Sequence, residues 1–364
     1  MIPQSDVKTA AGITDLTLVQ LKDFLKSLEE PAVRAGEIWQ CLYRDYAAGF
    51  EQMASLNPGL RQKLAQNAAF GTLELIKDSV SADAQTRKGL FRLWDSKTVE
   101  SALMISANAA AGRERRTVCV SSQVGCSVGC RFCSTGRQGF ERNLGPGEIV
   151  HQVLHFARLF GAATGKNTPG PITNVVFMGM GEPLANYDNV IQAVRILNDQ
   201  RGLGLGVHQI TISTAGLVPQ IRRLSEEKVQ FQVAVSLHAA NDKLRDMLVP
   251  VNKKYPLEQL MSAIRDFSEK KRRNIFIEYA LFNGINDSPE NAEELARLLE
   301  GLRCSINLIV GNDAGTEEFR PSSGEAAVAF QQLLMSRGYR TMLRFSRGAD
   351  IDAGCGQLRS RTAQ

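Results

Sequence analysis

The sequence predicts an α/β fold: a partial (β/α)6 barrel of the TIM-like kind, preceded by a small helical N-terminal domain and a linking β-hairpin. The region 14–70 carries apolar residues at helical spacing, and two β-rich runs around a polar turn follow it. From about residue 115, short β-rich runs alternate with helical stretches. Repeated βα units force parallel strands with right-handed crossovers. About six such units are fewer than the eight of a closed barrel, so the sequence predicts an open one.

The overall composition is that of an ordinary globular protein. The chain has 364 residues, 43% hydrophobic and 22% charged, which is enough for one large domain and one small one. No apolar run reaches the roughly 18–20 residues that a membrane span needs. The N-terminus lacks the basic region and apolar stretch of a secretory signal. We therefore expect a cytoplasmic protein with no membrane partner, and we expect a monomer.

The net charge of +5 is mild, but basic residues gather at 113–116 and 270–273. Such groups are usually solvated loops and helix ends. They are also the residues that contact phosphates in a nucleic acid. Charge alone therefore permits an RNA partner without establishing one.

The first predicted domain spans 1–75 and is helical. Its first helix has one apolar face and ends before Pro31. The residues of that face are Leu18, Leu21, Leu25 and Leu28. A second helix is expected around 38–42 and a third around 56–64.

The region 76–115 is predicted to be a linker that contains a β-hairpin. Apolar residues at 90–94 precede a polar turn at 95–97, and a second β-rich run covers 99–105. Two such runs on either side of a short polar turn are typical of antiparallel strands.

The region 116–364 is predicted to form the barrel. The expected strands are Thr117–Ser121, Asn174–Met178, Gln209–Ser213, Phe231–Ser236, Asn274–Leu281, Ser305–Val310 and Thr341–Phe345. The expected helices are Gly147–Phe160, 187–199, 217–228, 256–269, 290–301 and 324–337. Functional residues of such barrels gather at the C-terminal ends of the strands, so we look for a site there.

The strongest sign of chemistry is a C-x3-C-x2-C loop directly after the first expected barrel strand. Its cysteines are Cys126, Cys130 and Cys133. Gly125 and Gly129 allow the tight backbone that such a loop needs. A structural zinc site needs four protein ligands, so a zinc knuckle would have to use Cys119 as well. A cubane iron–sulfur cluster held by three cysteines leaves one iron open to chelate S-adenosylmethionine (SAM). We therefore expect one [4Fe-4S] cluster.

The cysteine loop, with Phe132 before its last cysteine, resembles the signature of the radical SAM superfamily. The segments Cys119–Cys126, Phe140–Leu144 and Asp350–Leu358 resemble a narrower family, the adenine C2-methyltransferases of 23S rRNA and tRNA with their relatives that methylate adenine C8. The resemblance runs nearly from end to end. It implies methylation of adenine C2 in 23S rRNA, with tRNA as a second substrate. It also implies two SAM molecules per turnover, an external electron donor and a disulfide reductant.

The resemblance also implies which residues bind SAM. Gly181 and Glu182 end the second expected barrel strand, and the family places them at the methionine end of the cofactor. The contacts implied at later strand ends are Ser213, Ser236, Leu237 and His238. Asn312 matches a cofactor-binding asparagine of the family. The surrounding segment 310–315 departs from the family's proline-and-aromatic pattern.

Two further cysteines and one acid complete the implied site. Cys355 lies between two glycines near the C-terminus, and Cys119 lies seven residues before the first cluster ligand. Two non-ligand cysteines at one site suit covalent catalysis followed by disulfide release. In the family these are the methyl-carrying and the resolving cysteine, and Glu100 matches the proposed proton acceptor. The remaining cysteines, Cys41 and Cys304, are expected on helices among apolar neighbours.

The implied mechanism is a radical one, because carbon 2 of adenine is electron-poor and cannot attack a sulfonium methyl. Cys355 takes a methyl group from one SAM, and a 5′-deoxyadenosyl radical from the second removes hydrogen from that methyl. The resulting carbon radical adds to an unstacked adenine, Glu100 takes a proton, and Cys119 releases the product by forming a disulfide with Cys355. The helical N-terminal domain and basic loops would bind folded RNA by shape and phosphate contacts.

Three alternatives stay open at this point. The same chemistry directed at adenine C8 would confer ribosomal antibiotic resistance. A zinc or iron–sulfur RNA-binding protein would use the cysteines without catalysis. A family member with a changed substrate would account for the unusual segment 310–315.

Overall fold

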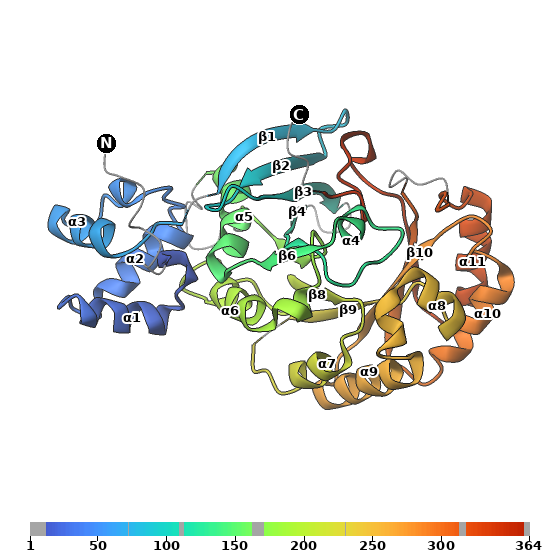
Figure 1. The fold of residues 1–364 in the computed structure, drawn as a ribbon. Helices are drawn as coiled ribbons and strands as arrows, with labels where there is room; N and C mark the ends of the chain where they lie inside the picture. The colour runs from blue at the N-terminus through green and yellow to red at the C-terminus, as the bar shows by residue number, and fades with distance from the viewer. Residues whose placement is uncertain are drawn as a thin grey trace.

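The computed structural model describes residues 12–71, 73–108, 113–161, 171–229, 231–312 and 318–359. Figure 1 shows a curved sheet with helices along its outer side and a separate group of helices at one end. The described strands form a ten-stranded sheet in the order β1-β2-β3-β4-β7-β8-β9-β10-β11-β12, and β5 and β6 form a second, two-stranded sheet.

The barrel part of the sheet is parallel throughout. Its strands are β4 (Arg113–Cys119), β7 (Asn174–Phe177), β8 (Ile210–Thr214), β9 (Gln232–Ser236), β10 (Ile275–Leu281), β11 (Cys304–Val310) and β12 (Thr341–Arg344). The connecting helices are α5 (Pro146–Arg158), α6 (Tyr187–Asn198), α7 (Val218–Leu224), α8 (Asp242–Leu248), α9 (Leu257–Lys271), α10 (Pro289–Leu298) and α11 (Gly324–Ser336). Because β12 pairs only with β11 among the described strands, the barrel stays open. The predicted partial (β/α)6 barrel is confirmed.

The predicted hairpin is also confirmed, but it belongs to a larger antiparallel extension. Strands β2 (Thr86–Arg92) and β3 (Thr98–Asn108) pair across the polar turn, and β3 pairs with β4 at the edge of the barrel. A third strand, β1 (Glu74–Val80), was not expected. Most of its side chains are exposed, so it lacks the apolar alternation that identifies a strand in a sequence.

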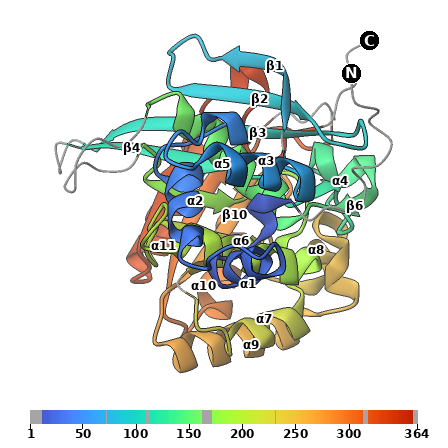
Figure 2. The same cartoon turned by 90° about the vertical axis from the view of Figure 1, so that its left-hand side faces the viewer.

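The N-terminal helices are α1 (Leu18–Ser27), α2 (Arg34–Tyr43) and α3 (Pro58–Asn67). Thr17 and Gln20 form a capping box at the start of α1. Figure 2 shows these helices in front of the barrel, close to α5. The two parts are joined by Arg158, whose Nε donates to the carbonyl oxygen of Tyr46 at 2.9 Å, and they share one hydrophobic core. The division into 1–75, 76–115 and 116–364 stays an interpretation.

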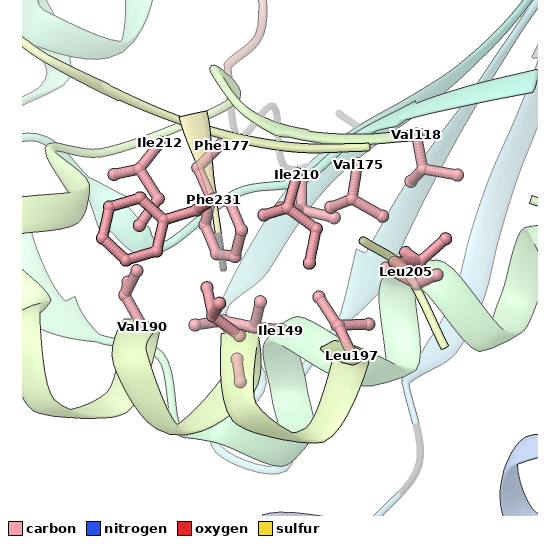
Figure 3. Close-up of a cluster of buried hydrophobic side chains, with 14 of the residues drawn as sticks. Val118, Ile149, Val175, Phe177, Val190, Leu197, Leu205, Ile210, Ile212 and Phe231 are labelled. Carbon is pink, nitrogen blue, oxygen red and sulfur yellow. The ribbon is translucent and has the colours of Figure 1, made fainter. Parts of the chain in front are cut away.

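The apolar layer between the sheet and the helices α5 and α6 fixes the positions of the strands (Figure 3). The labelled side chains of this layer are Val118, Ile149, Val175, Phe177, Val190, Leu197, Leu205, Ile210, Ile212 and Phe231. All are at most 4% exposed. Burying each such side chain contributes about 1.5–3 kcal/mol, so the ends of β4, β7 and β8 are held firmly where functional residues emerge.

Several short elements were not predicted. They are β5 (Gln123–Gly125), β6 (Phe140–Asn143), α4 (Ser134–Gln138) and α8, together with 3-10 turns at Ile13–Asp15, Phe50–Gln52, Pro183–Asn186, Pro250–Lys253 and Ala349–Ile351. The expected helical position of Cys304 is wrong, because this residue begins β11. Within the part of the chain that the structure describes, every helix is too short or too polar to cross a membrane.

Candidate active site

A cavity lies at the C-terminal ends of the barrel strands. Ten of the residues expected at the site line it: Cys126, Cys130, Cys133, Gly181, Glu182, Ser213, Ser236, His238, Asn312 and Cys355. Three expected residues do not line it, namely Leu237, Cys119 and Glu100. The sequence therefore located the cavity, but not the depth at which every side chain lies.

The cysteine loop is held by its backbone. The amide of Cys126 donates to the carbonyl oxygen of Gly139 at 2.7 Å. Gly125 has a φ of +73°, and a Cβ there would lie 1.9 Å from that same oxygen. Gly129 also has a positive φ, of +72°. The two glycines thus allow the turn that the sequence predicted from them.

The three thiols fit a cluster better than a single ion. Among the described residues, no three Cys, His, Asp or Glu side chains lie close enough to share one metal ion. A cubane cluster binds each thiolate on a different iron, so it needs sulfurs that lie further apart. Burial raises the pKa of Cys126 to about 12. Burial therefore disfavours a free thiolate here, whereas a metal bonded to the sulfur would stabilise the deprotonated form.

The carboxylate of Glu182 is fixed at the rim of the cavity. It is 3% exposed, and it accepts from the amides of Leu184 at 2.9 Å and Ala215 at 2.7 Å. Burial raises the pKa of Glu182, and these two donors oppose the rise. Gly181 has a φ of +98°, and a Cβ there would lie 2.5 Å from the side chain of Gln123. The strand end therefore needs glycine before the acid.

The ends of β8 and β9 bring three polar side chains into the cavity. The hydroxyls of Ser213 and Ser236 lie 3.3 Å apart. His238 has a φ of +62°, and its Nδ1 accepts from the amide of Ala280 at 3.0 Å. Burial lowers the pKa of His238 to about 3, so the ring is neutral and carries its proton on Nε2. The histidine can therefore donate one hydrogen bond to a ligand.

The side chain of Leu237 does not line the cavity. It is fully buried in the hydrophobic core. Its amide donates to the carbonyl oxygen of Glu278 at 3.0 Å. Side chains alternate across a strand end, so Leu237 points away when Ser236 points in.

The C-terminal loop places Cys355 beside the cysteine loop. Asn312 Nδ2 donates to the carbonyl oxygen of Cys355 at 2.9 Å. The amide of Ser134 donates to the carbonyl oxygen of Gly356 at 2.8 Å. The thiol of Cys355 is accessible from the cavity. Desolvation of the sulfur by the surrounding protein raises its pKa to about 11. Of the unusual segment 310–315, residues 313–315 lie outside the described part of the chain.

Cys119 lies close to this loop but behind the cavity wall. It is 9% exposed and packs with Ala102 and Ala353. Burial raises the pKa of Cys119, and a charge on Cys355 would raise it further. Both thiols are free. A zinc knuckle that uses Cys119 as fourth ligand is therefore not supported by this placement.

Glu100 is buried, unlike most glutamates on strands. It is 6% exposed and forms an ion pair with Lys88 at 3.0 Å. Its Oε2 also accepts from the amide of Arg359 at 2.9 Å. Glu100 thus contacts the C-terminal loop and not the cavity.

The two basic groups of the sequence have different surroundings. Lys270 pairs with Glu226, so the group at 270–273 is partly neutralised by the protein. Arg115 on β4 is exposed, and its pKa is lowered by partial burial and by the positive charge of Arg344. Two exposed arginines that repel each other form a favourable place for an anion.

Sequence reasoning missed two buried charged residues. Glu278 on β10 is 5% exposed, lines the cavity and accepts from Asn307 Nδ2 at 2.7 Å. Arg245 on α8 is 0% exposed. Glu278 could have been found from the sequence, because it is the one charged residue in an otherwise apolar strand. A charge that is buried in this way usually has a partner or a function. No such signal exists for Arg245, whose helix is short and mostly polar.

Comparison with known proteins extends these observations. The family model of the radical SAM superfamily matches residues 120–299, and that of the ribosomal RNA large subunit methyltransferase N-terminal domain matches residues 11–70. The chain is 42% identical over 354 residues to a dual-specificity RNA methyltransferase RlmN from Syntrophus aciditrophicus, and the aligned region covers 97% of each of the two chains. It is also 42% identical over 352 residues to the dual-specificity RNA methyltransferase RlmN 1 of Myxococcus xanthus, covering 97% of this chain and 95% of that one.

The fold matches a solved structure over almost its whole length. A crystal structure of a radical SAM methyltransferase from Sphaerobacter thermophilus superposes with a TM-score of 0.89 at 44% sequence identity. The match covers 96% of this chain and 99% of that one. The helical N-terminal domain and the barrel therefore occur together in that methyltransferase.

Proposed function

Because the chain belongs to the RlmN family of radical SAM RNA methyltransferases, we propose that it methylates C2 of adenine in 23S rRNA and tRNA through a methylated cysteine. The observation that carries the proposal is the position of Cys355. Its thiol lines the same cavity as the three-cysteine loop, and a second free thiol, Cys119, lies close to it.

Membership of the radical SAM superfamily implies a [4Fe-4S] cluster and SAM. When bound, they supply the electron and the hydrogen-abstracting radical that the chemistry needs. We propose that the cluster is held by Cys126, Cys130 and Cys133. SAM is bound by the residues at the strand ends: Gly181, Glu182, Ser213, Ser236, the backbone of Leu237, His238 and Asn312. Two SAM molecules are consumed in each turnover.

Cys355 acts as the methyl carrier. Its thiol loses a proton and takes a methyl group from one SAM, whose S–CH3 bond breaks to leave S-adenosylhomocysteine. Joining the methyl carbon to C2 of adenine then removes one hydrogen atom from the methyl group and a proton and one electron from the adduct, and that electron would pass to the bound cluster. Cys119 attacks the sulfur of Cys355, so that an S–S bond forms and the S–C bond breaks. The electron pair of that bond stays on the methyl carbon, which takes up a proton. An external disulfide reductant supplies two electrons to restore both thiols.

Glu100 is the proposed acceptor of the proton from C2. In the structure its carboxylate is engaged by Lys88 and by the amide of Arg359. It can therefore reach the base only when the C-terminal loop moves and takes Arg359 with it. The same movement would bring Cys355 toward Cys119, which already packs against Ala353 of that loop.

The substrate and setting follow from the same proposal. The exposed Arg115 and Arg344 offer charge for RNA phosphates, and the adenine must be unstacked to enter the cavity. A ribosomal RNA substrate puts the enzyme in the cytoplasm, where we propose that it acts as a monomer with an external electron donor.

The experiment is product mapping after anaerobic reconstitution. The protein is incubated with reductant, SAM and unmodified 23S rRNA or tRNA, and the digested nucleosides are identified by mass spectrometry, with Cys355→Ser as control. The proposal predicts 2-methyladenosine from both RNAs together with 5′-deoxyadenosine. Formation of 8-methyladenosine would move the activity to C8. Deoxyadenosine without any methyladenosine would indicate a changed substrate.

A further inference from the structure

Arg245 is a fully buried cation with no role in the steps above. Its guanidinium donates four hydrogen bonds. The acceptors are Leu237 O at 3.1 Å, Asn252 Oδ1 at 2.7 Å, Ala215 O at 2.6 Å and Ser236 O at 3.4 Å. All four are uncharged. The ion pairs of the described residues do not include Arg245.

The nearest acids lie beyond Asn252. The amide of Asn252 donates to Asp242 at 2.8 Å and to Asp246 at 2.7 Å, while its oxygen accepts from Arg245. Removing a guanidinium from water without an anionic partner costs several kcal/mol. Asp242 and Asp246 act on Arg245 through space and offset part of this cost, but among the described residues neither forms an ion pair with it, so further negative charge from another direction is favourable.

That direction is the cysteine loop. Cys130 packs in the same apolar cluster as Ala215 and Leu248, which adjoin Arg245 in space and in sequence. The amide of Arg131, next to Cys130, donates to the carbonyl oxygen of Leu248 at 3.2 Å, and Leu248 ends the helix that carries Arg245. The cysteine loop and the helix of Arg245 are therefore in direct contact. A thiolate-ligated cluster at Cys130 would supply the missing anion.

The hydrogen bonds of Arg245 also tie together the strand ends that face SAM. Ala215 follows β8, and its carbonyl oxygen accepts from Arg245 while its amide donates to Glu182. Ser236 ends β9 and Leu237 follows it, and the carbonyl oxygens of both accept from the same guanidinium. One side chain therefore fixes both strand ends and the peptide that orients Glu182.

We propose that Arg245 is the fixed counter-charge of the iron–sulfur cluster and that it raises the cluster's reduction potential, while its hydrogen bonds position the ends of β8 and β9. The inference rests on the proposed function for the presence of the cluster at Cys126, Cys130 and Cys133. Reduction adds an electron, so a nearby positive charge in a low-dielectric interior stabilises the reduced cluster more than the oxidised one. Arg245 is accordingly a positioning residue and does not touch the reacting atoms.

The test is the midpoint potential of the cluster in the reconstituted full-length protein. Iron and sulfide are counted first, and the cluster is then titrated against redox mediators while the electron paramagnetic resonance signal of its reduced form is followed.

Arg245→Lys keeps the charge and is expected to stay near the wild-type potential. Arg245→Gln removes the charge and is expected to have a lower potential. Arg297→Gln, which changes an exposed arginine on α10 whose Nε donates to Glu293 O, should leave the potential unchanged.

A second variant keeps the test decisive if Arg245→Gln does not fold. Asp246→Asn removes a negative charge near Arg245 but retains an oxygen that can accept from Asn252. It is expected to raise the potential, the opposite of Arg245→Gln. Unchanged potentials in every folded variant that holds about four irons would overturn the inference. A wild-type protein that binds no cluster would overturn the proposed function instead.

Discussion

The two sides of the cavity hold their cysteines in different ways. On one side, the loop with Cys126 and Cys130 is fixed by a backbone hydrogen bond to Gly139 and by a turn that only glycine at position 125 allows. On the other side, Cys355 follows a 3-10 turn that buries none of its residues. Its loop is held by hydrogen bonds that Asn312, Ser134 and Thr135 donate to its carbonyl oxygens. It is also held by the bond from the amide of Arg359 to Glu100 and by the buried side chains of Ala353 and Leu358.

The difference indicates that the cysteine loop is rigid and that the segment around Cys355 is easier to displace. Each hydrogen bond to the C-terminal loop contributes only about 0.5–1.5 kcal/mol, and Cys355 itself is exposed. The segment around Cys355 is therefore easier to displace than Ala353 and Leu358, which are buried on either side of it. The cysteine loop cannot move without breaking a backbone turn and disturbing the apolar cluster beneath it. The proposed cofactor site requires the first property, and the proposed methyl carrier, which would meet SAM, RNA and Cys119 in turn, requires the second.

Removing one cysteine from each side gives the largest effect and separates the two roles. Cys130→Ala and Cys355→Ala should both reduce RNA methylation to background, because one abolishes cluster binding and the other removes the methyl carrier. Only Cys130→Ala should lose iron. Iron analysis together with methyl transfer from labelled SAM checks this. Normal activity of either variant would contradict the assignment of that cysteine.

Removing the resolving thiol should stop the reaction one step later. Cys119→Ala retains the ligands and Cys355, so the methyl carbon should reach the RNA and remain bound to the enzyme. We expect a covalent protein–RNA species on denaturing gels, with little free product. Cys41→Ala is a matched control, because that buried cysteine lies on α2 in the N-terminal domain. If Cys119→Ala turned over normally, release would not use a disulfide.

A glycine substitution tests the rigidity of the ligand side. Gly125→Ala puts a Cβ 1.9 Å from a backbone oxygen at a φ of +73°. The strain of such a backbone alone is about 1–3 kcal/mol, and the overlap adds to it, so we expect lower thermal stability and incomplete iron incorporation. Gly139→Ala has a similar φ of +81° but no atom within 4 Å. Equal iron content in the two variants would show that the contact is unimportant.

Weakening one contact of the C-terminal loop gives the smallest effect. Asn312→Ala removes the hydrogen bond to the carbonyl oxygen of Cys355, and the loss of that bond alone should reduce kcat/KM roughly fivefold, in line with about 1 kcal/mol. The loss of its proposed contact with SAM should add to this reduction. The iron content should stay normal, and alkylation of Cys355 should become faster. Thr135→Val removes the bond to Leu358 O at 2.5 Å and should act in the same direction. Loss of iron in either variant would mean that the two sides are not independent.

Much of this architecture could be predicted from the sequence, and the failures have physical causes. The parallel strands were predicted because each is a short apolar run bounded by polar turns. The cavity was located because strand ends, glycines and cysteines coincide in the chain. Strand β1 was missed because its side chains are mostly exposed, and Cys304 was misplaced because an isolated apolar residue does not distinguish a helix end from a strand start.

The depth of individual side chains was harder to predict. The side chain of Leu237 is buried in the core because the alternation of side chains continues past the end of β9. Glu100 is buried because it pairs with Lys88 and accepts a hydrogen bond from the C-terminal loop. Arg245 and Glu278 were missed because their hydrogen-bond partners are distant in the sequence. Their partners, such as Ala215 and Asn307, are 30 and 29 residues away in sequence, and pairing over that separation depends on the tertiary fold.

The most direct test of the account is the chemical state of Cys355 after reaction with SAM. The reconstituted protein is incubated with methyl-labelled SAM and reductant in the absence of RNA, digested, and its cysteine peptides are analysed by tandem mass spectrometry. The account predicts a labelled methyl group on Cys355 that disappears into RNA when substrate is added. Labelled RNA formed by a protein whose Cys355 never carries the label would contradict it.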